Sequence, residues 1–352
     1  MLRANSLTPY PTMNPNIAKL LTANLGDTRA AHLMTLVAMP EGLPVDIEGR
    51  ATRAEIAQAL NVVLFGGILD RVPTGRAYTD DVARAGGKVT FDHGALRTVK
   101  WPNGALPEGE AAFTRILRPL GYVLNGTYPL DRIGMTGRSY AHADAPEQIA
   151  QFFLSEFHPD RERYSDAFRA AVTRVTETSA DPLTPRAQSL LWQLERDGLL
   201  SVDDGAELVG LLARCFERHH PAPRLEDYET LLKESAEMAW ISTEGNAFNH
   251  ATDRVDDVFA LAEQQKAVGR PMKEKVEVSG SGRVKQTAFR ADPVVRDFVG
   301  ADGKTVQREV PGSFYEFITR DRFHDEQAAR TRYDLGFDAG NAQGIFKMTA
   351  AA

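Results

Sequence analysis

A seven-residue motif occurs twice in this chain, and it limits the folds that the sequence can adopt. Residues 91–97 read FDHGALR and residues 248–254 read FNHATDR, so both copies place Phe, Asp or Asn, His, three residues and Arg in the same order. Two copies in different halves of the chain indicate a duplicated module. We expect the two modules to pack around a pseudo-two-fold axis, with both histidines close to that axis.

A second pair of similar segments follows the motif at a similar interval in each half. Residues 153–157 read FLSEF, and residues 313–317 read SFYEF. Each half therefore carries a histidine followed by a glutamate at a matching point. This arrangement predicts a metal site that the two modules share.

The composition is that of a globular protein whose partner is neither a nucleic acid nor a membrane. The 352 residues are 43% hydrophobic and the formal net charge is −7, whereas phosphate backbones are bound by clustered Lys and Arg. No long apolar run occurs, and the first residues lack the apolar core of a signal peptide. The single cysteine, Cys215, excludes an internal disulfide, so we expect a cytoplasmic protein in a reducing compartment.

The chain is longer than one ordinary core requires, so we expect more than one structural unit. The periodicity of its apolar residues divides it into five parts. The first part is expected to be helical, and Thr52 with Glu55 predicts a capping box at the start of one helix. Two parts alternate like strands around a helix, which predicts an α+β fold built from two β-α-β-β-β modules. The parts are a helical N-terminal region (1–85), a first module (86–160), a helical insertion (161–237), a second module (238–322) and a C-terminal segment that closes the site (323–352).

The candidate metal ligands are two histidines and one glutamate. This set is typical of non-haem Fe(II) enzymes that use O2, because it leaves coordination positions open for substrate and oxygen. The candidates are His93, His250 and either Glu156 or Glu316, and the residues alone do not choose between the two glutamates. A lone histidine in a strand is more often structural, but the repeated motif favours a ligand role.

Each motif also carries an arginine four residues after its histidine. Side chains at i and i+4 of a strand point to the same face, so Arg97 and Arg254 are both candidates for contact with a ligand. A guanidinium suits a carboxylate because its forked donors match two oxygens. Arg254 lies among Asp253, Asp256 and Asp257, so we expect it to pair with these carboxylates, and Arg97 to face the ligand.

With these residues in place, the chain resembles the 2-oxoadipate dioxygenase/decarboxylases, also called 2-hydroxyglutarate synthases. The resemblance covers nearly the whole chain and depends on the order and spacing of His, His and Glu. It implies the vicinal-oxygen-chelate, or glyoxalase-like, architecture, in which paired β-α-β-β-β modules form a metal-binding cup with helical additions. The matching stretches are DHGALRTV (92–99), NHAT (249–252), QTA (286–288), YEFITR (315–320, its fifth residue not matched) and GIF (344–346).

The resemblance also implies a ligand set. An Fe(II) ion would be held by His93, His250 and Glu316, which selects Glu316 over Glu156. The bound metal would be the protein's cofactor.

The reaction that the resemblance implies converts 2-oxoadipate and O2 to 2-hydroxyglutarate and CO2, a step of lysine breakdown. Arg97 would bind a carboxylate of the 2-oxo acid, and the backbone around Gly340 would contact the substrate. The implied partners are therefore a small 2-oxo acid and O2.

Two other functions remain open on the same fold. A glyoxalase-like isomerase or lyase would use a redox-silent metal with Glu156 as a fourth ligand. A metal-free binding module would keep the cup without activity. The sequence does not fix the exact 2-oxo acid, the stereochemistry of the product, the oligomeric state or the role of the helical insertion.

Overall fold

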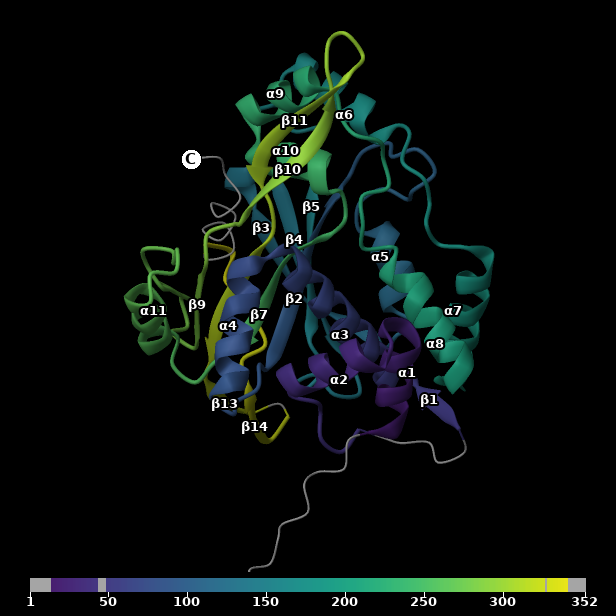
Figure 1. The fold of residues 1–352 in the computed structure, drawn as a ribbon, viewed down its shortest axis with the longest axis vertical. Coiled ribbons are helices and arrows are strands. Elements are labelled where there is room, and N and C mark those ends of the chain that lie inside the picture. Colours follow the sequence, from purple (N-terminus) through teal and green to yellow (C-terminus); the bar gives the residue numbers. More distant parts are fainter. Residues whose placement is uncertain (1–13, 44–48, 327, 341–352) are drawn as a thin grey trace, which may run out of the picture.

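The centre of the molecule is one curled sheet of eight strands (Figure 1). The structure is a computed structural model that describes residues 14–43, 49–326 and 328–340. The matched stretch 344–346 and the end of the predicted C-terminal segment lie outside these residues. In spatial order the strands are β3 (Tyr122–Leu130), β4 (Met135–His142), β5 (Gln151–Phe157), β2 (Phe91–Val99), β7 (Phe248–Arg254), β12 (Phe314–Arg320), β9 (Val284–Ala288) and β8 (Glu277–Val278).

Each half of the sheet has the strand order of a β-α-β-β-β module. In the first half β2 pairs in parallel with β5, β5 pairs antiparallel with β4, and β4 pairs antiparallel with β3. In the second half β7 pairs in parallel with β12, β12 pairs antiparallel with β9, and β9 pairs antiparallel with β8. The helices α5 (Ala111–Leu117) and α11 (Val258–Ala267) follow the first strand of each module. The predicted fold class, two such modules in an α+β protein, is confirmed.

The two modules meet where β2 and β7 pair antiparallel. His93 lies opposite Thr252, and His250 lies opposite Ala95. Each histidine therefore faces the residue two positions after the other histidine, as a two-fold axis through the Gly94 and Ala251 pair requires. The two copies of the motif are related by this pseudo-two-fold axis.

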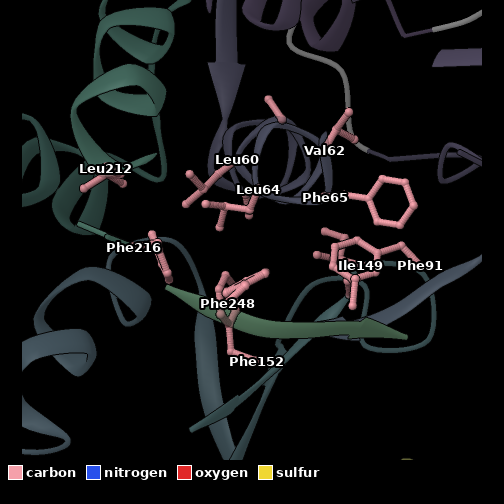
Figure 2. Close-up of a cluster of buried hydrophobic side chains, with 14 of the residues drawn as sticks. Leu60, Val62, Leu64, Phe65, Phe91, Ile149, Phe152, Leu212, Phe216 and Phe248 are labelled. Atoms are coloured by element: carbon pink, nitrogen blue, oxygen red, sulfur yellow. The ribbon is translucent and has the colours of Figure 1, made fainter. Parts of the chain in front are cut away.

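One face of the sheet packs against the long helix α3 (Arg53–Arg71), which crosses the central strands in Figure 1. Figure 2 shows Leu60, Leu64 and Phe65 of this helix above Phe152 and Phe248 of the sheet. All five side chains belong to one buried apolar cluster. Burying such side chains contributes roughly 1.5–3 kcal/mol each, so this layer holds α3 against the strands.

The other N-terminal helices, α1 (Pro15–Leu25), α2 (Asp27–Leu36) and α4 (Pro73–Arg84), surround α3. Thr52 and Glu55 form the predicted capping box, in which each side chain accepts from the backbone N–H of the other residue. Gly26 ends α1 with a φ of 75°, in the left-handed region that favours glycine. These local signals explain why the segment divides into separate helices.

The helices between the modules form two groups. α7 (Pro185–Asp197) and α8 (Val202–Ala213) lie with the N-terminal helices, and the short strands β1 (Arg50–Thr52) and β6 (Leu199–Ser201) pair between the two regions. α6 (Asp166–Thr176), α9 (Leu225–Glu234) and α10 (Ala236–Glu244) lie at the other end of the sheet, beside the hairpin of β10 and β11 (Figure 1).

Two hairpins are added to the second module. β10 (Pro293–Val299) and β11 (Thr305–Pro311) form the first, between β9 and β12. β13 (Arg322–Asp325) and β14 (Arg330–Tyr333) form the second, directly after β12. This second hairpin directs the chain back across the face of the sheet that α3 does not cover.

Over the described residues, no single helix has the length and apolar composition of a membrane span. Only α3 and α4 taken together reach that length and composition, and a bend of 115° separates them.

Candidate metal centre

Three buried side chains from three strands converge on the face of the sheet opposite α3. They are His93 of β2, His250 of β7 and Glu316 of β12, and their candidate ligand atoms all lie within 4.8 Å of one another. Glu316 Oε2 is 3.4 Å from His93 Nε2 and 2.7 Å from His250 Nε2. Two imidazoles and a carboxylate at these separations could hold a metal ion.

Strand register brings the three residues together. Thr252 of β7 lies opposite His93 on one side and opposite Glu316 on the other. Its hydroxyl donates to Glu316 Oε2 at 2.9 Å and lies 3.1 Å from His93 Nε2. Thr252 therefore occupies the middle of the site and orients the carboxylate.

The residue before each histidine in the motif holds the imidazole ring from behind. Asp92 Oδ1 lies 2.9 Å from His93 Nδ1, and the side-chain nitrogen Nδ2 of Asn249 lies 3.1 Å from His250 Nδ1. Exchanging the nitrogen and oxygen of the Asn249 amide would place an oxygen there to accept the Nδ1–H. Such partners fix the proton on Nδ1 and leave an Nε2 lone pair for a metal. Two Nε2 atoms and a carboxylate oxygen directed to one place are a set of donor atoms that fits a bound metal.

Asp92 is itself fixed by a buried ion pair. Arg320 donates to both carboxylate oxygens of Asp92 through Nε and Nη2, at 2.9–3.0 Å, and both side chains are almost fully buried. Removing one partner of such a pair costs about 3–5 kcal/mol because the other charge stays buried and uncompensated. The pair therefore makes the orientation of His93 rigid.

Burial and the neighbouring charges shift the pKa values at the site. Burial lowers the pKa of His250. Although burial opposes ionisation, the two imidazoles hold the pKa of Glu316 well below its usual range, and Arg320 and His93 do the same for Asp92. Burial also disfavours the His93 cation, but hydrogen bonds to Asp92 and Glu316 raise the pKa of His93. Both carboxylates are thus anions, which suits a divalent cation.

The chain after β14 covers part of the site. Arg320 Nη1 donates to the carbonyl oxygens of Asp334 and Gly336, at 2.8 and 2.7 Å. The Phe337 ring then lies edge-on to His93, with 4.8 Å between ring centroids, and beneath the Arg320 guanidinium. This segment shields the imidazole from solvent.

Gly340 is exposed, and its N–H donates to Asp338 Oδ1 at 2.8 Å. Its predicted contact with substrate stays a prediction.

Arg97 is a fully buried cation in the strand that carries His93. Its guanidinium lies 4.5 Å from the ring centroid of Trp240 on α10. Burial lowers the pKa of Arg97 to about 10, which still leaves it protonated at neutral pH. A buried guanidinium in the strand that carries His93 could bind the carboxylate of a small acid, and this role stays a prediction.

Arg254 does not make the predicted ion pairs with its own segment. It lies 3.8 Å from Asp92, across the pseudo-two-fold axis, and donates to the backbone oxygen of Glu147. Its guanidinium also stacks on Tyr333. The prediction failed because neighbouring side chains on a strand point to opposite faces. The pairing of β2 with β7 instead brings Asp92, from the other copy of the motif, close to Arg254.

Glu156 lies on the wrong face of the sheet to be a metal ligand. It accepts from Glu110 N–H at 2.7 Å and from Arg138 at 3.2 Å, near the start of α5. The apparent match of 153–157 to 313–317 is therefore wrong: Glu316 pairs with the residue two positions after His250, whereas Glu156 pairs with Thr98, five positions after His93. The alternative with Glu156 as a fourth ligand fails for the same reason.

Sequence reasoning assigned no role to the residues that support the triad. The Asp or Asn before each histidine was a visible signal, because both can accept from Nδ1. Arg320 was visible as the last residue of a matched stretch. Thr252 was visible in the same way, as the last residue of the matched stretch 249–252, although its role depends on strand register. Phe337 carried no signal, since its role depends on the path of the chain after β14.

Comparison with known proteins identifies the family. The model of the family described as 2-oxoadipate dioxygenase/decarboxylase matches residues 77–344, well over half of the chain. The chain belongs to this family. The resemblance inferred from the sequence is therefore confirmed.

Three relatives show what the chain is similar to. It is 79% identical to a glyoxalase superfamily protein from Ralstonia eutropha JMP134, whose crystal structure matches with a TM-score of 0.89 over 93% of this chain and 100% of that chain. Hydroxyglutarate synthase from Oryza sativa, solved in complex with 2-oxoadipate, is 20% identical with a TM-score of 0.59, over 89% of this chain and 98% of that chain; this likeness shows the fold.

The third relative is the chloroplastic 2-oxoadipate dioxygenase/decarboxylase of Arabidopsis thaliana. It is 25% identical over 191 residues, which are 50% of this chain and 49% of that protein. The chain thus matches about half the length of this relative.

Proposed function

We propose that this protein is an Fe(II)-dependent dioxygenase/decarboxylase that converts 2-oxoadipate and O2 to 2-hydroxyglutarate and CO2, as in lysine breakdown. The observation that carries the proposal is the buried triad of His93, His250 and Glu316, with each imidazole supported at Nδ1. Family membership and relatives named for the same reaction support it. Three protein ligands leave positions for a chelating 2-oxo acid and for O2.

The protein's own groups have separate tasks in this reaction. His93, His250 and Glu316 would hold the metal, which when bound supplies a Lewis acid for the 2-oxo acid and electrons for the reduction of O2. Arg97 binds a carboxylate of the substrate and so orients its carbon chain. Phe337 covers the His93 side and excludes water.

A series of 2-oxo acids of graded chain length tests the proposal. Metal-free protein is loaded with Fe(II) under argon, mixed with each acid, and then exposed to O2 while O2 consumption and CO2 release are followed. We expect one O2 consumed per CO2 released, with 2-oxoadipate as the best substrate and 2-hydroxyglutarate as the product. The reaction then balances without a further reductant.

Two variants form a matched pair of buried glutamates for this experiment. Glu316→Gln is expected to abolish both iron retention and O2 consumption. Glu156→Gln removes a buried carboxylate outside the triad and is expected to leave both unchanged. Turnover under argon without O2 consumption would instead favour the isomerase or lyase, and equal metal content in native protein and Glu316→Gln would favour a metal-free binding module.

A further inference from the structure

The pseudo-two-fold axis assigns a partner to every residue of the triad. The axis exchanges His93 with His250 and Ala95 with Thr252. Glu316 lies beside Thr252 in the second module, and Phe153 lies beside Ala95 in the first. The register therefore makes Phe153, and not Glu156, the counterpart of Glu316.

Phe153 has no atom that can bind a metal, and it is packed firmly in place. Its side chain is buried and stacks on Tyr128, with ring centroids 5.7 Å apart. Its ring centroid also lies 4.8 Å from that of Phe337, which in turn is 4.8 Å from His93. The place of a second carboxylate is thus part of an aromatic wall beside the metal site.

The differences between the halves are concentrated on this side of the site. The first module has Ala95 where the second has Thr252, whose hydroxyl donates to the Glu316 carboxylate. Both the carboxylate and the group that orients it are therefore absent from the first module.

We infer that Phe153 keeps the metal's coordination sphere open on the side of the first module, and so makes the site suitable for reaction with O2. A carboxylate at this position would give four protein ligands, related by the two-fold axis. Four protein ligands would leave too few coordination positions for a chelating substrate and O2 together. The inference rests on the proposed function for its chemistry, but its structural part concerns only the number of protein ligands.

Moving the carboxylate across the axis tests the inference. Binding of Co2+, as a probe, is measured by competition with a chelator for native protein, Glu316→Ala, and the double variant Glu316→Ala with Phe153→Glu. We expect Glu316→Ala to weaken Co2+ binding by at least about tenfold and the added glutamate to restore most of that loss. No recovery in a double variant that keeps the native circular dichroism spectrum would overturn the inference.

Single variants at Phe153 provide the second measurement. Phe153→Glu is expected to bind Co2+ about tenfold or more tightly than native protein, to change the visible spectrum of the bound Co2+, and to lose O2 consumption. Phe153→Leu keeps an apolar residue there, so it should fold and bind Co2+ as native protein does. If the glutamate variants do not fold, Phe153→His carries the same expectation of tighter binding without a buried charge, and binding no tighter than in Phe153→Leu overturns the inference.

The two proposals fail in different ways. Native protein that does not consume O2 with any 2-oxo acid contradicts the proposed function, whatever the Co2+ affinities are. Native protein that does consume O2, together with Co2+ binding that Phe153→Glu does not tighten, contradicts the role of Phe153 alone.

Discussion

Asp253 is a buried carboxyl group that should make the stability of this protein depend on pH. It lies in β7, outside the metal triad, and only 3% of it is exposed. The Tyr78 hydroxyl donates to Oδ2 at 2.7 Å, and the Thr90 N–H donates to Oδ1 at 2.9 Å. Burial nevertheless raises the pKa of Asp253 to about 7, because these two donors offset only part of the desolvation.

The size and sign of the effect follow from the two protonation states. An aspartate in an unfolded chain has a pKa of about 3.9, so as pH rises the unfolded chain releases its proton before the folded protein does. Stability from this group is fully present below about pH 4 and is lost progressively until about pH 7. A difference of about three units corresponds to a loss on the order of 4 kcal/mol.

Asp253→Asn removes this dependence while keeping the local hydrogen bonds. The amide oxygen can accept from Thr90, and the amide nitrogen can donate to the Tyr78 hydroxyl. We therefore expect the stability of Asp253→Asn relative to native protein to increase between pH 4 and pH 8, by up to about 4 kcal/mol. Other titrating groups cancel because they are present in both proteins.

Urea unfolding at pH 5, 6, 7 and 8, with a chelator present in every sample, measures the difference. Asp302→Asn is the matched control, since it removes a carboxylate that is exposed near the β10–β11 turn. A difference for Asp253→Asn that does not change with pH would refute the reasoning, and so would a relative stability that falls as pH rises.

Three further outcomes are expected. Asp92→Asn should weaken Co2+ binding by about 10–100-fold in chelator competition, because it removes the anion behind the imidazole, whereas Asn249→Asp should not weaken it. Gly94→Ala should lower the free energy of unfolding, measured in urea, by about 1–3 kcal/mol, since the added Cβ would lie 2.3 Å from Phe248 Cε2. Combining it with Phe248→Leu should cost less than the sum of the two single changes, and strict additivity would contradict this explanation. Arg97→Lys keeps the charge but loses the fork, so KM for 2-oxoadipate should rise about tenfold with Co2+ affinity unchanged; an unchanged KM would exclude Arg97 from substrate binding.

The sequence was sufficient to predict the parts of this fold that short-range patterns determine. The duplicated motif predicted two modules, and both copies lie on the two central strands. The capping box predicted the start of α3 because it involves only Thr52 and Glu55. Each of these patterns is contained in a few neighbouring residues, and so it can be recognised in the sequence.

The correspondence between the two glutamates could not be predicted in the same way. The similar residues of segments 153–157 and 313–317 aligned Glu156 with Glu316. Relative to the histidine of its own module, however, Glu156 is shifted by an odd number of residues, and such a shift moves a side chain to the other face of a sheet. Register depends on how β5 and β12 pair with strands far away in sequence. The resemblance to a family supplied the choice of Glu316 that the periodicity of the segment could not supply.

The asymmetry of the site also bears on where a bound substrate would lie relative to the three candidate ligands. In the second module Glu316 and His250 could hold a metal. The first module contributes His93 and, on the neighbouring strand, Phe153 beside Ala95. If Phe153 keeps one side open, the open positions face the first module. Arg97 lies on the first strand of that same module, so a substrate whose carboxylate binds there could also reach these open positions. A second carboxylate in the first module would then occupy positions that a substrate bound to Arg97 would need.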